Sequence, residues 1–256
     1  MGCLKQKRSR QLETDIRVHA LASGSSGNCT LVRANDTTLL IDAGLSARAI
    51  ESHCRRLGVA LESIDAILLT HEHSDHILGA ATLARRAKAP ILTNAATLQA
   101  ITSRANTDFP TQELPTGEMM GMGKVGIRSF AVPHNATEPV GWVIEAGSGR
   151  IAYATDVGSV TPDVREAIQG AHLVVIEANH DIRWLWNGSY SPQMKAQVAS
   201  PIGHLSNEDC AELLAERMEQ DTAVTVWLAH LSRQNNAPAL AKRTVSERLA
   251  KQRCVP

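Results

Sequence analysis

The stretch Thr70-His71-Glu72-His73-Ser74-Asp75-His76 directly follows the apolar run Ala66-Ile67-Leu68-Leu69. The apolar run predicts a buried strand, and the stretch after it places three imidazoles and two carboxylates at the end of that strand. Neutral imidazole and carboxylate suit zinc, manganese and iron, and each costs free energy if left unpaired beside a core strand. In a turn, the first two histidines converge on one point, and the aspartate and third histidine are directed at a second. The stretch therefore predicts ligands for two metal ions.

Composition is typical of a soluble globular protein. Of the 256 residues, 43% are hydrophobic and 20% are charged, which is ample material for a core. Lys plus Arg equals Asp plus Glu at 26 each, so no overall field attracts a polyanion, and a nucleic-acid substrate needs a local basic groove. Aromatic residues make up only 3%, which limits any platform on which bases could stack.

The cysteines and the N-terminal residues predict a cytoplasmic protein. The five cysteines are odd in number, widely spread and without a Cys-x-x-Cys pair, which argues against a disulfide framework and indicates a reducing compartment. Residues 1–15 are basic with no apolar stretch behind the charges, so we expect a disordered tail rather than a secretory signal. No window approaches the apolar length of a membrane span. A homodimer is compatible with the sequence.

Apolar and alternating runs predict a β-rich stretch followed by β/α units, with the same order repeated in the second half. Two mixed sheets packed together, with helices on their outer faces, fit this order, so we expect one four-layered αββα domain over residues 16–256. The Gly/Ser turn at 23–28 is interpreted as a plain hairpin, and the alternative is that its backbone N–H groups line the site. A helix cap at Ser46 follows, and residues 105–124 have no clear assignment. The expected strands are 16–22, 29–32, 38–42, 64–69, 91–93, 127–132, 140–144, 151–155, 173–176 and 224–229, and the expected helices 46–57, 78–87, 95–103, 192–199, 206–219 and 237–252.

Polar side chains recur near the ends of the later apolar strands. Each stands where a strand brings a side chain to the rim of a sheet, which is where sites are commonly built on α/β frameworks. One such residue alone is better explained as a hydrogen-bonded rim group, but several at like positions predict a shared site. They are His134, Asp156, Glu177, His180 and His230.

These motifs resemble the metallo-β-lactamase superfamily, and within it the YycJ/WalJ family on the nuclease and phosphodiesterase side, near RNase Z. The resemblance covers about residues 16 to 252 and implies the αββα fold. It rests on the segments 21–28, 40–44, 69–76, 154–158, 177–181, 203–207 and 228–232.

The resemblance implies two divalent metal ions, and the ligand types do not select among zinc, manganese and iron. A bridging carboxylate suits two cations about 3.5–4 Å apart, the arrangement used for phosphodiester cleavage, in which a bridging hydroxide attacks phosphorus. The implied ligands are His71, His73 and His134 for the first ion, Asp75, His76 and His230 for the second, and Asp156 for both.

The resemblance also implies catalytic roles for Asp75, His204 and Glu177. His204 would touch the scissile phosphate and protonate the leaving oxygen, with Glu177 orienting it. Among the late histidines, His204, His180 and His230 all stay candidates for the second metal site. His230 ends an apolar strand, which favours it as a ligand, whereas His204 precedes a helix start, which suits an anion.

Two further residues are expected to support ligands without binding metal. Asp42 is interpreted as an acceptor that braces the turn at 71–76. His180 is interpreted as a partner of a ligand, although an exposed polar role explains it equally well. Arg233, just past His230, is a weaker candidate for pairing with a phosphate.

The leading hypothesis is a dinuclear phosphodiesterase acting on nucleic acid, DNA rather than RNA, as an exonuclease. No long Gly-rich insertion resembles the tRNA-gripping arm of RNase Z, so tRNA processing is disfavoured. A small cyclic or nucleotide phosphodiester is a second substrate hypothesis, and a thioester or lactone on the same scaffold is a third. Asp156 in the bridging position argues against the β-lactamase pattern, which includes a cysteine. The full ligand set disfavours a non-catalytic protein.

Overall fold

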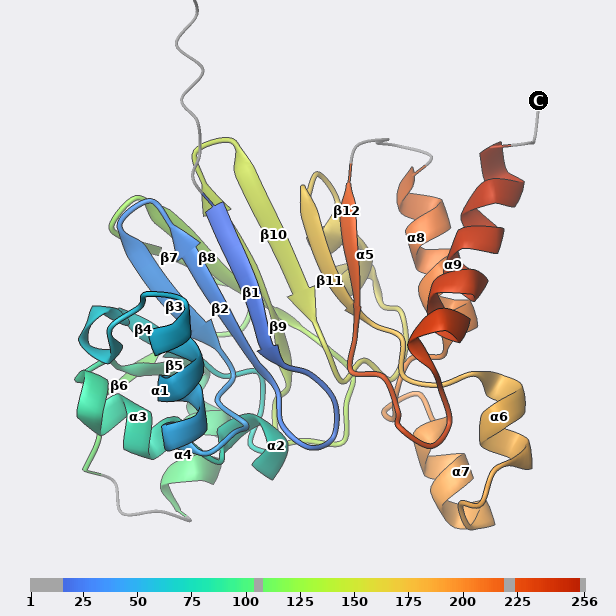
Figure 1. The fold of residues 1–256 in the computed structure, drawn as a ribbon, viewed down its shortest axis with the longest axis horizontal. Coiled ribbons are helices and arrows are strands. Elements are labelled where there is room, and N and C mark those ends of the chain that lie inside the picture. Colours follow the sequence, from blue (N-terminus) through green and yellow to red (C-terminus); the bar gives the residue numbers. More distant parts are fainter. Residues whose placement is uncertain (1–15, 104–107, 219–223, 254–256) are drawn as a thin grey trace, which may run out of the picture.

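The computed structural model describes residues 16–103, 108–218 and 224–253. Two six-stranded sheets pack face to face, and helices cover their outer faces (Figure 1). The predicted four-layered αββα sandwich is therefore confirmed. The basic segment expected over residues 1–15 lies outside the described residues. Within them, no helix is long and apolar enough to cross a membrane.

The first sheet and its helices come from the first half of the chain. The elements are β1 (Ile16–Ala22), β2 (Cys29–Ala34), β3 (Thr37–Ile41), α1 (Ala47–Arg56), the 3₁₀ turn η1 (Leu61–Ser63), β4 (Ala66–Leu68), α2 (Ser74–Ile77), α3 (Ala80–Ala87), β5 (Ile91–Thr93), α4 (Ala95–Thr102) and β6 (Thr111–Glu113).

The second sheet and its helices come from the second half. The elements are β7 (Met119–Met122), β8 (Val125–Ala131), β9 (Val140–Ala146), β10 (Gly149–Ala154), α5 (Pro162–Ile168), β11 (Leu173–Glu177), α6 (Ile182–Asn187), α7 (Pro192–Val198), α8 (Asn207–Met218), β12 (Thr225–Ala229) and α9 (Pro238–Arg253).

Both sheets follow one plan, in which an antiparallel meander leads into parallel strands. In the first sheet β1, β2 and β3 are antiparallel, and β3 to β6 run parallel. In the second, β7 to β10 are antiparallel, and β10, β11 and β12 run parallel. The carboxyl ends of the parallel strands of both sheets meet at the lower edge in Figure 1, and this edge carries the site.

Side-chain alternation explains why the strands are apolar on both faces. On β3, Leu39 and Ile41 pack between the two sheets, whereas Leu40 packs under α1 and α3. On β10, Tyr153 lies between the sheets and Ala152 faces the helices of the second half. A strand buried on both faces reads as a continuous apolar run, which is why these strands were predictable from sequence.

Several elements differ from the predictions. The segment 105–124 without an assignment contains β6 and β7, which are short and mostly exposed. The helices α5 and α6 were not predicted, although Thr161 caps α5 and a proline begins it. The predicted helix 78–87 is α3, which begins two residues later at Ala80, and the short helix α2 before it was not predicted.

Candidate active site

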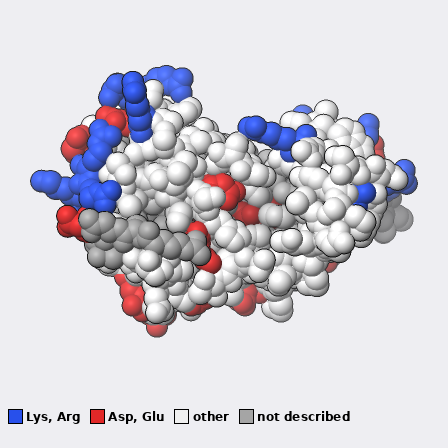
Figure 2. Space-filling view, turned by 90° about the horizontal axis from the view of Figure 1, so that it is seen from below, with Lys and Arg blue, Asp and Glu red and all other residues white. Residues whose placement is uncertain are grey.

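The site residues come from both sheets and meet at one end of the sandwich. Asp42 follows β3, the cluster 71–76 follows β4, and His134 lies between β8 and β9. From the second sheet, Asp156 follows β10, Glu177 ends β11, His204 precedes α8 and His230 follows β12. Seen from this end, the molecule has a hollow with acidic residues at its centre (Figure 2).

Three of these residues bend the backbone into the left-handed region. The φ angles are 59° at Asp42, 57° at Asp156 and 52° at His230. Residues other than glycine rarely adopt this conformation, which costs on the order of 1 kcal/mol each. Each bend comes within two residues of the end of a parallel strand and places a side chain of the site.

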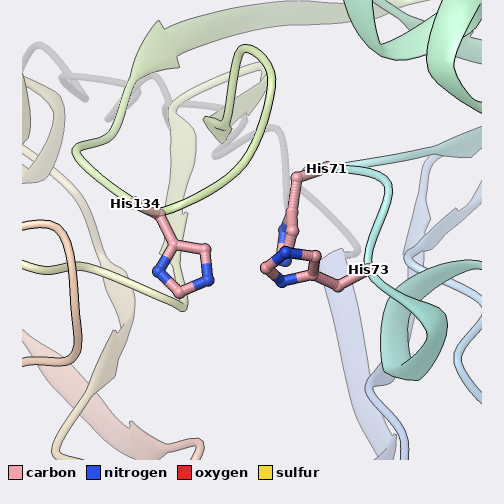
Figure 3. A group of neighbouring side chains, drawn as sticks. All are labelled: His71, His73 and His134. Carbon is pink, nitrogen blue, oxygen red and sulfur yellow. The ribbon is translucent and has the colours of Figure 1, made fainter. Parts of the chain in front are cut away.

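His71, His73 and His134 form the first group of possible ligands. Their ring centroids lie 4.5 Å apart for His71 and His73, 5.1 Å for His71 and His134, and 5.2 Å for His73 and His134. Figure 3 shows the three rings gathered about one space, with His134 reaching in from the opposite side. His134 Nδ1 donates to the Gly203 carbonyl at 3.0 Å, which leaves Nε2 for a ligand bond.

Asp75, His76 and His230 form the second group. The Asp75 Oδ2 atom lies 3.5 Å from His76 Nε2 and 3.8 Å from His230 Nε2. Asp156 lies between the groups, with Oδ2 at 3.1 Å from His76 Nε2 and Oδ1 at 3.7 Å from His134 Nε2. A carboxylate that bridges two metal ions would have to lie here, between the two groups of ligands.

Asp42 supports the turn from beneath. Its Oδ2 lies 2.8 Å from His76 Nδ1, and its Oδ1 accepts from the Thr70 N–H at 2.9 Å. Both side chains of the Asp42–His76 pair are fully buried. The bond places a proton on Nδ1 of His76 and turns Nε2 toward Asp156.

Glu177 links two histidines of the second sheet. Its Oε1 accepts from His204 Nδ1 at 2.9 Å and from His230 Nδ1 at 2.7 Å. Its Oε2 accepts from the N–H groups of Val157 at 2.7 Å and Leu205 at 3.2 Å. The His204 side chain is 23% exposed, whereas that of His230 is 3% exposed. One buried carboxylate thus orients an interior ring and a ring that reaches solvent.

Burial and carboxylates compete for the charge of the histidines. Burial opposes protonation of His76, but Asp42 and Asp156 outweigh it and hold the pKa of His76 well above its usual value. Burial is likewise outweighed at His230, whose pKa Asp156, Asp75 and Glu177 raise to about 10. At His71 burial prevails, and its pKa lies well below the usual value. Without a cation, protons therefore offset the carboxylate charge in the second group.

The donor atoms fit divalent cations. Nε2 of His71 and Nε2 of His230 are buried without a hydrogen-bond partner among the described residues. Each such atom costs on the order of 1–3 kcal/mol unless something satisfies it. The described part of the chain offers four overlapping groups of possible ligands, two of which are the first and second groups above. They contain imidazole and carboxylate and no thiolate, the donor set of zinc, manganese and iron.

Asn28 is a site residue that was not predicted. The turn at 23–28 joins β1 to β2 as a hairpin, as expected, and it also contacts the site, which was the alternative interpretation, but through the side chains of Ser23 and Asn28. The Asn28 amide nitrogen lies 3.0 Å from His76 Nε2 and 3.4 Å from Asp75 Oδ2, and Ser23 Oγ accepts from the His230 N–H at 2.8 Å. The sequence signal that could have indicated this role is the Asn at the end of a Gly/Ser turn.

Glu72 was also not predicted to have a role in the site. Its Oε1 accepts from the N–H and hydroxyl of Thr137, at 2.9 Å and 2.7 Å. These bonds tie the turn of the first histidines to the loop that carries His134. Its position between two histidines gave no indication of this partner.

His180 and Arg233 have weaker positions. His180 is buried but lies outside the four groups of possible ligands, and its Nδ1 has no hydrogen-bond partner among the described residues. Arg233 is exposed and donates to Ser26 Oγ at 2.9 Å. His180 as the partner of a ligand and Arg233 as a phosphate contact therefore stay predictions.

Two packed mixed sheets with a histidine- and carboxylate-rich site at the ends of their parallel strands define a metal-dependent hydrolase of the αββα class. The chain belongs to the β-lactamase superfamily domain family, whose model matches residues 37–231.

Curated relatives and solved structures agree with this assignment. The chain is 36% identical over 235 residues to the exodeoxyribonuclease YycJ of Bacillus anthracis, covering 91% of this chain and 88% of that protein. It is 36% identical over 242 residues to the exodeoxyribonuclease WalJ of Streptococcus pneumoniae serotype 2, covering 93% and 90%. The metallo-β-lactamase fold protein YhfI of Bacillus subtilis matches with a TM-score of 0.70 and 18% identity, over 91% of this chain and 92% of that one. The predicted resemblance to the YycJ/WalJ family is confirmed.

Proposed function

We propose that this chain is a dinuclear phosphodiesterase that removes nucleotides from an end of DNA. The relatives named exodeoxyribonuclease support a nuclease. One observation carries the proposal to phosphodiester chemistry: a partly exposed histidine, His204, is held by the buried Glu177, and its ring centroid lies 5.2 Å from that of His134 and 5.4 Å from that of His230. A strand cleaved at phosphorus needs such a proton donor for its leaving oxygen.

The residues divide into ligands and proton-transfer groups. When bound, two divalent ions would activate water and offset the charge of the phosphate. His71, His73 and His134 would hold one ion and Asp75, His76 and His230 the other, with Asp156 between them.

His204 supplies the acid. Burial disfavours its charge, but Glu177 outweighs burial and raises the pKa of His204 above its usual value. The raised pKa favours the protonated ring, which would donate a hydrogen bond to the scissile phosphate and give its proton to the leaving oxygen. Glu177 is a positioning residue, because it acts through His204 and His230.

Asp75 is the carboxylate that meets the attacking water. Burial is outweighed by His230 and His76, which hold the pKa of Asp75 well below its usual range, so it is ionised at neutral pH. Its side chain is 24% exposed, so the ionised carboxylate can accept a hydrogen bond from a water in the hollow.

A panel of substrates tests the proposal. Metal-loaded protein is assayed with end-labelled DNA and RNA, bis(p-nitrophenyl) phosphate, a cyclic nucleotide and a thioester, beside elemental analysis of bound metal. We expect mononucleotide release from DNA, loss of metal and activity in His73→Ala, and retained metal with a loss of about 10²–10⁴ in rate in His204→Asn. Thioester turnover without phosphodiester cleavage would refute the proposal.

A further inference from the structure

Exposed large hydrophobic side chains concentrate in one segment beside the site. Five of the eight in the described residues lie within residues 182–202, with exposed fractions from 40% to 52%. We call this segment, which contains α6 and α7, the α6–α7 platform. Exposed apolar side chains that cluster in this way mark a binding surface rather than ordinary surface scatter. They are Ile182, Trp184, Trp186, Met194 and Ile202.

The platform is fixed to the site at both ends. It begins five residues after Glu177 and ends two residues before His204. Just before α6, the Asp181 N–H donates to the Asn235 carbonyl at 3.0 Å, in the loop that follows His230. At the other end, the His204 N–H donates to the Val198 carbonyl of α7 at 2.9 Å. A substrate bound on the platform would therefore lie next to the proposed acid.

The charge of the platform suits a polyanion. Residues 182–202 contain no Asp or Glu and have two basic residues, Arg183 and Lys195. Their remaining polar side chains are neutral amides and hydroxyls. In Figure 2 the lobe to the right of the acidic hollow, where Figure 1 places α6 and α7, is uncharged over most of its surface. Phosphates approaching the site along this side meet no carboxylate repulsion.

The aromatic content of the platform suits nucleobases. The chain has only four tryptophans, and two of them, Trp184 and Trp186, are about half exposed here at 48% and 52%. Bases inside a duplex already stack on one another, so an unpaired base offers its face to an indole ring more readily than a paired one. The scarcity of aromatic residues in the whole chain therefore does not prevent a local stacking platform.

We infer that the α6–α7 platform holds an unpaired strand of nucleic acid that leads into the site, with its bases stacked on Trp184 and Trp186. This inference rests on the proposed function and names its substrate as a single-stranded or frayed end. Stacking tolerates any base and supplies affinity that a chain with zero net charge lacks. A second copy of the chain is the competing occupant that the test must exclude.

The test compares a polymeric with a small substrate. For Trp184→Ala, Trp186→Ala and the double variant, kcat/KM is measured on a single-stranded oligonucleotide and on bis(p-nitrophenyl) phosphate. We expect the ratio of the two values to fall about fivefold or more for each alanine, and to recover largely in the phenylalanine variants. Met119→Ala, which removes a side chain 57% exposed on β7, is the matched control and should keep the ratio of the wild type.

Binding without cleavage separates this inference from the proposed function. Titration with a phosphorothioate oligonucleotide should quench tryptophan fluorescence in the wild type and not in the double variant. Quenching by a wild type that cleaves no phosphodiester would refute the function and support the platform. If the ratio of the two kcat/KM values in the double variant equals that of the wild type, the inference is overturned. It is also overturned if the wild type is a dimer and the double variant a monomer with the same ratio.

Discussion

Replacing Asp42 with Asn tests whether the carboxylate beneath the site fixes the proton of His76. In the structure, Asp42 Oδ2 lies 2.8 Å from His76 Nδ1, and both side chains are fully buried. Asn keeps the shape and one oxygen, which can still accept from the Thr70 N–H. Its amide NH₂ group, however, meets the Nδ1–H of His76. Because two donors cannot share a bond, the proton moves to Nε2, where the lone pair for a metal is needed.

The expected effect is a loss of affinity at one of two ions. Removing an outer partner of a metal-bound histidine costs about 10- to 100-fold in affinity, or about 1.4 to 2.7 kcal/mol. The loss should fall on the ion proposed for Asp75, His76 and His230. The ion of the first group should be affected less, because Asp42 reaches the ligand His71 of that group through the Thr70 hydroxyl and not directly.

Competition with a chromophoric chelator measures both affinities. Asp65→Asn is the matched control, because Asp65 Oδ2 also accepts a backbone N–H, that of Thr38 at 2.8 Å, but lies outside the groups of possible ligands. Thermal melts of both metal-free variants show that the fold is kept. Wild-type affinity for both ions in Asp42→Asn would refute the reasoning.

Three further predictions follow from burial and charge. In Gly44→Ala the new Cβ would lie 1.5 Å from the Asp75 carbonyl oxygen, so we expect a loss of about 3 kcal/mol or more in urea unfolding; a wild-type midpoint would contradict this. In the metal-free protein, burial opposes ionisation of Glu177, but His204 and His230 hold its pKa at about 2, below the usual 4.5 of a glutamate. The ionised form therefore stabilises the fold above the unfolded pKa, and this stability is lost as pH falls toward 2. When unfolding is measured at stepped pH, the free energy of unfolding should fall about 3 kcal/mol more on acidification in the wild type than in Glu177→Gln. Parallel pH profiles of the two proteins would contradict this prediction. Chelation should abolish hydrolysis and lower the melting temperature by several degrees, with recovery on adding a divalent ion, whereas an unchanged melt would show that no bound ion supports the fold.

Local signals made much of the fold predictable. Ser46 caps α1 by accepting from the Ala49 N–H, and Ser206 accepts from the Asp209 N–H at the start of α8, as the sequence indicates. The short helix α6 was missed because its apolar and aromatic residues lack a helical period, and only Leu185 among them is buried. Its tryptophans lie at the protein surface, and a search for the periodic apolar pattern of buried core residues cannot detect a helix of this kind.

The sequence by itself determined the ligand types. The residues of 71–76 and the polar groups after the later strands are written in the chain, and their chemistry predicts metal. Their mutual arrangement was not predictable, because Glu177 and His230 stand 53 residues apart and meet only through the register of β11 and β12. Left-handed bends at Asp42 and Asp156 then place side chains that no periodicity describes. Tertiary packing alone decided that one buried carboxylate accepts hydrogen bonds from two histidines. It also decided that exposed tryptophans lie beside the site. Contacts between residues distant in sequence depend on how the two sheets pack.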